Sequence, residues 1–161
     1  MKTERLNLRK FSETDIDIVY EINNHPECIR FNGWDEMPRE KCLQVIKNWK
    51  NKYDTLERSG VFHISVSESS TPLGMAFIVD HNETGNYEIG FRFRRSLWGN
   101  GYAQEITRFF MEYAQTTLNA NSIFGEVHVD NINSCRIFDK LKFEKQVHPS
   151  GPSGVLYKYT Y

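Results

Sequence analysis

The segment from residue 87 to residue 129 constrains the fold most, because its hydrophobic period changes twice. Residues 87–93 have the composition of a strand, and a turn with two glycines follows. The turn leads into a helical stripe, after which residues 122–129 predict a strand again; the stripe consists of Ala103, Ile106, Phe110, Tyr113 and Thr117. Strand, turn, helix and strand in this order predict a crossover connection, so part of the sheet is expected to be parallel.

The rest of the chain predicts further strands and three more helices. Further strands are expected at residues 6–8, 61–66, 75–80, 143–147 and 155–161. Helices are expected after the Ser12–Asp15 capping pattern, from Pro38 onward, and at residues 133–141. A chain of 161 residues fits one domain over residues 1–161. The predicted class is α/β (α+β), with a mixed, largely antiparallel sheet of about seven strands flanked by helices.

Composition excludes several classes of protein. Lys and Arg total 20 and Asp and Glu total 21, so the net charge of -1 argues against a nucleic-acid binder. The longest strictly apolar run, residues 75–79, is too short to span a membrane, so no membrane partner is expected. Three scattered cysteines and five histidines without ligand spacing predict no disulfide framework and no metal. Residues 1–5 are not followed by an apolar stretch, so we expect no signal peptide and a cytoplasmic protein.

The turn before the main helix is a candidate anion site. Gly99 and Gly101 allow backbone N–H groups to approach an anion, and the following helix points its positive end there. No Lys stands where a nucleotide-binding P-loop needs it, and Gln104 occupies the third glycine position of a dinucleotide-binding motif. On these residues alone, a plain strand-to-helix turn remains the alternative.

The same turn resembles a known motif. Residues 98–103, Trp-Gly-Asn-Gly-Tyr-Ala, resemble the pyrophosphate-binding motif Gln/Arg-x-x-Gly-x-Gly/Ala of the GNAT superfamily of N-acetyltransferases, with Trp98 in place of Gln or Arg. Residues 131–143 resemble the second motif of that family, and residues 4–9 and 24–27 resemble its RimJ/RimL branch. The resemblance covers nearly the whole chain in order.

The resemblance implies acetyl-CoA as co-substrate, bound in a gap where the central strands splay apart. Backbone groups of Phe91, Arg92 and Phe93 would bind the pantetheine arm and the acetyl carbonyl, and Asn131 would hydrogen-bond the pantetheine. The amides from Trp98 to Gln104 would bind the pyrophosphate; this set is Trp98, Gly99, Asn100, Gly101, Tyr102, Ala103 and Gln104.

The resemblance also implies catalytic roles for two residues. Glu88 would act as general base through a water, the alternative being a half-exposed strand residue in an ion pair. Ser134 would protonate the leaving thiolate, the alternative being a helix N-cap. Phe138 stands where many members carry a tyrosine proposed as general acid, and a phenyl ring has no proton to give.

Other residues have open roles under the same resemblance. Phe31 and Trp34 would wall the acceptor site, or simply pack a loop. Arg94 and Arg95 would screen phosphates or stay solvated, and the same choice applies to Arg136, Lys140 and Lys142 near the last helix.

The sequence thus predicts an acetyl-CoA-dependent N-acetyltransferase that acts as a monomer or homodimer. Its acceptor would be a primary amine, either a protein N-terminus or a small molecule. A non-catalytic acyl-CoA-binding regulatory module on the same fold is the alternative, motivated by Phe138.

Overall fold

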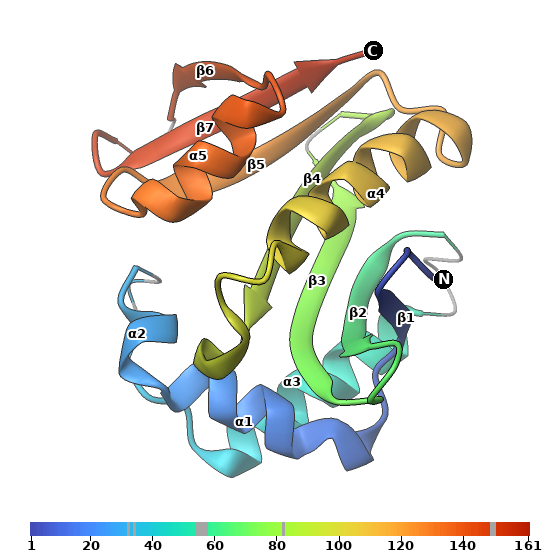
Figure 1. Ribbon diagram of the computed structural model, residues 1–161, viewed down its shortest axis with the longest axis vertical. Helices are drawn as coiled ribbons and strands as arrows, with labels where there is room; N and C mark the ends of the chain where they lie inside the picture. Colours follow the sequence, from blue (N-terminus) through green and yellow to red (C-terminus); the bar gives the residue numbers. More distant parts are fainter. Residues whose placement is uncertain (32, 34, 54–57, 82, 149–150) are drawn as a thin grey trace. The chain divides into compact units, whose positions relative to one another are not determined.

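The computed structural model of the chain describes residues 1–31, 33, 35–53, 58–81, 83–148 and 151–161. The strands are β1 (Leu6–Lys10), β2 (Gly60–Val66), β3 (Pro72–Asp80), β4 (Asn86–Phe93), β5 (Ser122–His128), β6 (Glu144–Val147) and β7 (Gly154–Thr160). The helices are α1 (Ile16–Asn24), α2 (Pro26–Ile29), α3 (Arg39–Lys52), α4 (Tyr102–Thr116) and α5 (Ile132–Lys140), with short 3-10 turns η1 (Glu13–Asp15) and η2 (Arg95–Leu97) (Figure 1).

The seven strands form one open mixed sheet in the order β1-β2-β3-β4-β5-β7-β6. Strands β4 and β5 run parallel, which confirms the crossover expected from the sequence. The pairs β1–β2, β5–β7 and β6–β7 are antiparallel. The predicted fold class is therefore confirmed.

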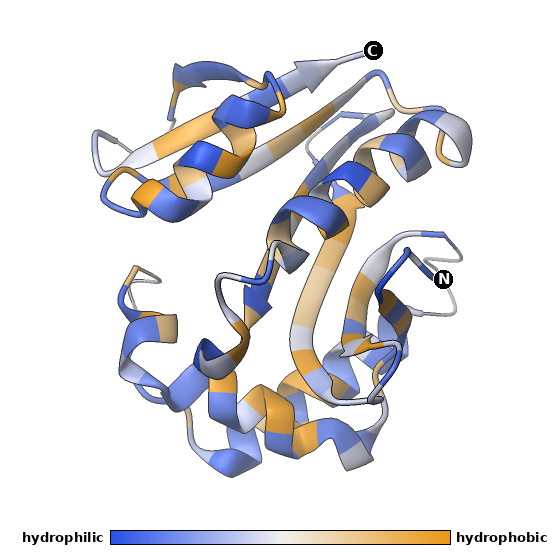
Figure 2. Cartoon of the chain, in the orientation of Figure 1, coloured by the Kyte–Doolittle hydropathy of each residue, from blue (hydrophilic) through white to orange (hydrophobic). Residues whose placement is uncertain are grey.

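The chain divides into two compact units, and β3 and β4 each contribute residues to both. The first unit comprises Met1–Phe77 and Phe91–Tyr102. Its helices α1 and α3 share an apolar cluster that includes Val19, Ile22 and Ile46, each with no exposed surface. Figure 2 shows α1 with alternating apolar and polar positions, as expected of a helix buried on one side.

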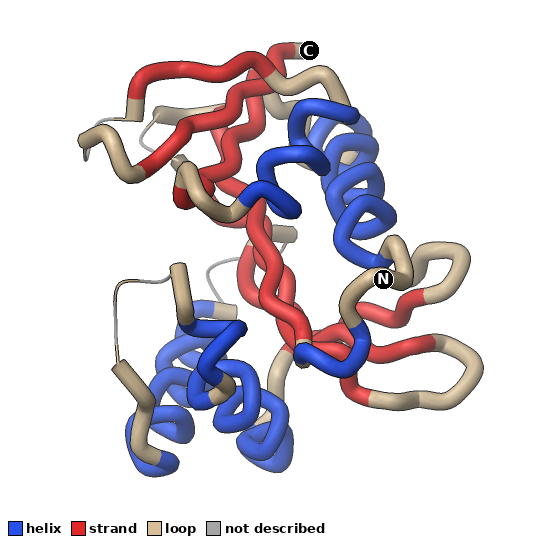
Figure 3. The backbone as a smooth tube through the Cα atoms, turned by 60° about the vertical axis from the view of Figure 1, so that its left-hand side comes forward, coloured by secondary structure: helices blue, strands red, loops and turns tan. Residues whose placement is uncertain are grey.

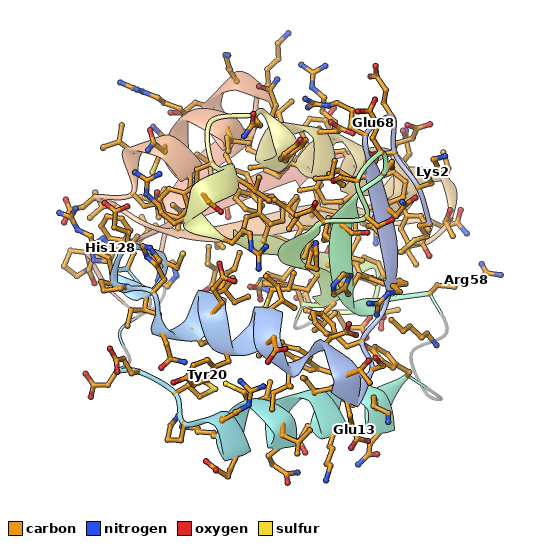
Figure 4. All side chains as sticks on the ribbon, turned by 60° about the horizontal axis from the view of Figure 1, so that its bottom comes forward. Lys2, Glu13, Tyr20, Arg58, Glu68 and His128 are labelled. Atoms are coloured by element: carbon orange, nitrogen blue, oxygen red, sulfur yellow. The ribbon has the colours of Figure 1, made fainter. Side chains whose placement is uncertain are left out.

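The surface of these helices carries polar links between them. Glu13 and Tyr20 lie on the surface of the first unit (Figure 4). The Glu13 carboxylate is 2.7 Å from the Lys50 ammonium, and the Arg39 guanidinium lies 5.5 Å from the centre of the Tyr20 ring. Both contacts connect the α1 region to α3.

Three details of the first unit differ from the sequence expectation. The Ser12–Asp15 capping box begins the 3-10 turn η1 (Glu13–Asp15) and not α1, which begins after that turn at Ile16. Pro38 precedes α3 as its cap residue instead of occupying the first helical position. Helix α2 was not expected; His25 caps it by accepting a hydrogen bond from the Glu27 N–H at 3.3 Å.

The second unit comprises Ile78–Gly90 and Ala103–Tyr161. The backbone of α5 packs on β5 of this unit (Figure 3). The Phe138 ring of α5 stacks on the Tyr157 ring of β7, with the ring centres 5.0 Å apart. A side chain at Gly125 would bring its Cβ to 2.4 Å from the Phe138 ring, so this contact requires glycine. Helix α4 buries Ile106 and Phe110 as expected.

Helix α4 also buries two residues outside the predicted stripe, Thr107 and Ala114, whereas Tyr113 is only half-buried. Thr107 is tolerated there because its hydroxyl donates to the Ala103 carbonyl at 2.8 Å. No helix among the described residues is both long and apolar enough to cross a membrane.

Candidate functional site

The turn between η2 and α4 has the backbone of an anion site. We call residues 98–101 the anion turn. Its φ angles alternate in sign: −68° at Trp98, +83° at Gly99, negative at Asn100 and +80° at Gly101. The positive φ of both glycines allows backbone N–H groups of this turn to come close to an anion. The 15-residue helix α4 begins directly after the turn, so the partial positive charge of its N-terminus also favours an anion there.

One side of the anion turn is open. A Cβ added at Gly99 would meet no atom within 4 Å, so the described residues leave this side of the turn open. Beside Gly101 lies Arg5: a Cβ added at Gly101 would be 3.5 Å from Nη2 of Arg5. The turn therefore combines a positive φ at both glycines with open space for a phosphate.

Arg5 holds the anion turn from the other end of the sequence. Its Nη1 donates to the Asn100 carbonyl at 3.0 Å, and its guanidinium lies 4.8 Å from the centre of the Tyr102 ring. The sequence analysis missed Arg5 because no local pattern links residues that are 95 positions apart.

The two basic residues before the turn have other partners. Arg94 forms an ion pair with Glu21 of α1, and Arg95 forms one with Glu27 of α2. The Trp98 indole N–H turns back to the Phe93 carbonyl at 2.8 Å, and the same carbonyl accepts from the Cys28 thiol at 3.5 Å. A pantetheine arm at Phe93 would therefore use other backbone groups of this strand or compete with these donors.

Strand β4 pairs in parallel with β5 near the beginning of the strand. Its parallel pairing with β5 covers Asn86–Glu88, whereas the strand continues to Phe93. Phe91 and Phe93 lie further along β4, in the part of the strand that belongs to the first unit. Arg92 lies between them; its Nη1 donates to Asn23 at 3.3 Å, and burial lowers the pKa of Arg92 to about 10.

Glu88 lies on a face of the second unit shared by three strands. We call His81, Glu88, Phe124, Glu126 and Lys158 the carboxylate face. Glu88 and Phe124 are register partners on parallel strands, so their side chains share a face, and Glu126 is two residues further along β5. The His81 ring stacks on Phe124 at 4.3 Å, and the Lys158 ammonium lies 5.6 Å from the same ring centre.

The surroundings of Glu88 favour its neutral form. Its carboxylate lies 4.0 Å from Nδ1 of His81, and the two side chains are 28% and 15% exposed. Burial, followed by the charge of Glu126, raises the pKa of Glu88 above its ordinary value. A raised pKa makes this half-buried carboxylate a stronger proton acceptor than an ordinary glutamate.

Glu126 has a second partner on the same face. Its carboxylate lies 3.3 Å from Nε2 of His148, whose side chain is 9% exposed. Glu126 and His81 were absent from the sequence prediction. The signal that would find them is the parallel β4–β5 register, which places Glu88, Phe124 and Glu126 on one face.

Asn131 and Ser134 meet at the start of α5. The Asn131 side chain accepts from the Ser134 N–H at 3.2 Å, so Asn131 is the N-cap. The alternative that Ser134 caps this helix is wrong, because Ser134 is the third residue of the first turn. The half-buried Ser134 hydroxyl is therefore not used as a cap.

Phe138 belongs to the core of the second unit. Its ring contacts Tyr157 and Phe143, both at 5.0 Å. The Tyr157 hydroxyl is buried as well. Phe138 thus serves packing, and no proton donor stands at this position.

The acceptor-wall residues are only partly described. The Phe31 ring is half-buried, with the Arg30 guanidinium 5.2 Å from its centre. Trp34 lies outside the described residues. Across the ranges that the structure describes, no group of three or more His, Cys, Asp or Glu side chains could hold a metal ion.

A family model and a relative of known sequence both match this chain to acetyltransferases. A family model described as an acetyltransferase (GNAT) domain matches residues 5–144. An uncharacterized N-acetyltransferase, p20, of Bacillus licheniformis is 30% identical over 149 residues, which cover 89% of this chain and 82% of p20.

Solved structures agree with this at the level of the fold. An acetyltransferase (GNAT family) from Bacillus anthracis superposes with a TM-score of 0.86 at 18% identity, covering 99% of this chain and 97% of that one. The microcin C7 self-immunity acetyltransferase MccE, solved with acetyl-CoA and AMP, superposes with a TM-score of 0.78 at 13% identity, covering 98% and 93%.

Proposed function

Since the chain belongs to the GNAT acetyltransferase domain family, we propose that it transfers an acetyl group directly from acetyl-CoA to a primary amine. The observation that carries this proposal is the combination of an anion turn with a raised-pKa carboxylate on β4. Because β3 and β4 contribute residues to both compact units, we propose that the two units act as one catalytic domain over residues 1–161.

The residues of the anion turn fit the pyrophosphate of acetyl-CoA. The alternating φ angles and the open side of Gly99 support N–H donation from Trp98 to Gln104. Binding of the pantetheine arm by the backbone of Phe91, Arg92 and Phe93 is supported by their place on β4, shortly before the anion turn. Asn131 would add a side-chain contact to the pantetheine while it caps α5. Bound acetyl-CoA supplies the activated acetyl group as a thioester.

Glu88 would act as the general base. An alkyl ammonium ordinarily has a pKa near 10, so the acceptor must lose a proton before it attacks. The Glu88 carboxylate would take that proton through a water, and its raised pKa makes it a better acceptor of protons. The amine nitrogen then bonds to the acetyl carbonyl carbon, the carbon–sulfur bond breaks, and the nitrogen releases its second proton to solvent to leave the amide.

Ser134 would return a proton to the departing thiolate. Its hydroxyl is not used as a helix cap, and Phe138 has no proton to offer. The thiol leaves once the sulfur has taken the hydroxyl proton, and solvent restores the serine.

The acceptor would be a protein N-terminus or a small-molecule amine bound near Phe31 and Trp34. Residues 4–9 and 24–27 support placement in the RimJ/RimL-like branch. We expect a cytoplasmic enzyme that is a monomer or a homodimer.

A second candidate is a non-catalytic acyl-CoA-binding regulatory module. One observation favours it: Phe138 is locked into the core by Tyr157 and Gly125, at the position where a general acid would be expected.

Two measurements separate the candidates. Calorimetric titration with acetyl-CoA, with desulfo-CoA as control, tests whether the protein binds the proposed co-substrate. Absence of binding at millimolar ligand would overturn both candidates. Thioester turnover is then measured on a panel of a peptide N-terminus, a polyamine, an amino sugar and an aminoglycoside. Turnover that is lost in Glu88→Gln and kept in Glu144→Gln, an exposed carboxylate on β6, supports the enzyme. Binding with no turnover on the whole panel supports the regulatory module.

A further inference from the structure

Arg5 reaches the anion turn from a rigid start of the chain. The Thr3 N–H donates to the Leu6 carbonyl at 2.9 Å, and the Leu6 N–H donates to the Thr3 hydroxyl at 3.0 Å. The Arg5 carbonyl accepts from the Ser67 N–H at 2.8 Å. These bonds fix the backbone on both sides of Arg5, so its side chain starts from a defined point.

The Arg5 guanidinium contacts three successive residues. One nitrogen donates to the Asn100 carbonyl, a second would lie 3.5 Å from a Cβ at Gly101, and the plane lies over the Tyr102 ring. Only arginine can make this combination of contacts, because its planar guanidinium donates hydrogen bonds at its edge and stacks with its face. The lysine ammonium is a compact charge without such a face. Arg5 therefore spans the end of the anion turn and the first residue of α4.

This contact determines the direction of one peptide plane. In a trans peptide the carbonyl and the following N–H point in opposite directions. Because Arg5 holds the Asn100 carbonyl, the Gly101 N–H points away from Arg5. The positive φ of Gly101 is compatible with this plane, and the same turn is open beside Gly99.

The contact is also unusual for a purely stabilising one. The hydrogen bond is exposed to solvent, and exposed contacts of this kind add little to folding stability. It places an arginine, a side chain suited to phosphate recognition, directly beside the anion turn. Its position at the turn indicates a role in binding.

We propose that Arg5 is a positioning residue for the co-substrate: it locks the Asn100–Gly101 peptide so that the Gly101 N–H faces the pyrophosphate of acetyl-CoA. This inference rests on the proposed binding of acetyl-CoA. It adds a residue from outside the turn, 95 positions away in sequence, to the binding apparatus.

The test compares a ligand that contains the pyrophosphate with one that lacks it. Dissociation constants of CoA and of pantetheine are measured by calorimetry for wild type, Arg5→Met and Arg5→Lys, with Arg108→Met as the control for loss of an exposed arginine on α4. We expect CoA affinity to fall about tenfold in both Arg5 variants, the loss of about one charge-assisted hydrogen bond. We expect pantetheine affinity, and both affinities of Arg108→Met, to stay within about twofold of wild type.

Three results would overturn the proposal. The first is unchanged CoA affinity in Arg5→Met. The second is an equal loss for CoA and pantetheine, which would show an effect outside the pyrophosphate. The third is full retention of affinity in Arg5→Lys, which would show that charge suffices. Near-ultraviolet circular dichroism checks folding, and Arg5→Lys carries the test if Arg5→Met does not fold. If wild type itself binds no CoA, the proposed function fails instead.

Discussion

The anion turn and the carboxylate face differ in how the chain builds them. The anion turn comes from four consecutive residues that lead directly into α4, and its properties are those of the backbone. The carboxylate face draws side chains from β3–β4, β5 and β7, at positions from His81 to Lys158. A backbone site binds a phosphate with little dependence on side-chain identity, whereas a pKa depends on every charge nearby. We therefore expect the first region to control binding and the second to control chemistry.

The largest expected effect is on the chemistry of the carboxylate face. Glu88→Gln should lower kcat/KM by about 100- to 1000-fold, the usual contribution of a positioned base. Because Glu88 must be deprotonated to act as a base, kcat/KM of the wild type should rise as pH passes through the raised pKa of Glu88. This acidic limb of the pH–rate profile should be absent in Glu88→Gln. Steady-state thioester assays across pH measure both. A variant with full activity would remove Glu88 from the mechanism.

The next effect falls on the anion turn. Gly101→Val places a β-branched residue at a φ of +80°, which costs about 2 kcal/mol of strain. If the turn changes its conformation to relieve this strain, its backbone no longer matches the phosphates. Acetyl-CoA binding should then weaken by about 30-fold, which is the equivalent of about 2 kcal/mol. Gly151→Val is the control, since Gly151 also has a positive φ, of +110°, and open surroundings. Equal affinity of the two variants in calorimetry would place the phosphates elsewhere.

A smaller effect refines the electrostatics of the carboxylate face. The charge of Glu126 helps to raise the pKa of Glu88, so Glu126→Gln should move the acidic limb of the pH–rate profile to lower pH. The plateau value of kcat/KM above this limb should change by less than about threefold, because Glu88, the base itself, is still present. Glu144→Gln, with its exposed carboxylate, should leave the profile in place. A limb that stays fixed in Glu126→Gln would show that the two carboxylates do not interact.

The smallest functional effect is expected away from both regions. Asp15 bonds both guanidinium arms of Arg9 and the Ser12 N–H, and these bonds hold the pKa of Asp15 well below its usual range. Asp15→Asn should cost about 2 kcal/mol of unfolding free energy at pH 7, typical of hydrogen bonds to a charged group.

Acid should reduce this difference between wild type and Asp15→Asn. Because the folded-state pKa is depressed, the stabilisation is complete above the unfolded value of about 4 and is lost as pH falls through the folded pKa. Urea unfolding at several pH values checks the sign, and turnover at pH 7 should stay within about twofold of wild type. A gap that widens in acid would contradict the assignment.

Local features of the fold and site could be predicted from the sequence. The crossover could be predicted because the hydrophobic period changes along one continuous segment. The anion turn could be predicted because Gly99 and Gly101 are the residues that adopt a positive φ most readily. The alternative that Ser134 caps α5 is wrong, since Asn131 is the cap and both residues have capping side chains. The choice between them depends on where the first turn of α5 begins, which the sequence pattern does not specify to the residue.

The non-local features could not be predicted in the same way. Glu88 was identified through its strand, but His81 and Glu126 become its neighbours only through strand pairing. Arg5 and Asn100 meet through the fold of the first unit, and no spacing rule connects them. Side-chain partners from separate elements need the register, which a single sequence does not specify.

The division of roles is tested most directly by one matched pair of variants. Acetyl-CoA affinity by calorimetry and turnover at saturating acetyl-CoA are measured for Glu88→Gln and Gly101→Val in parallel. We predict opposite results: Glu88→Gln binds as wild type and fails to turn over, whereas Gly101→Val binds weakly and turns over once saturated. If both variants lose affinity and turnover to the same extent, binding and chemistry are not divided between the two regions.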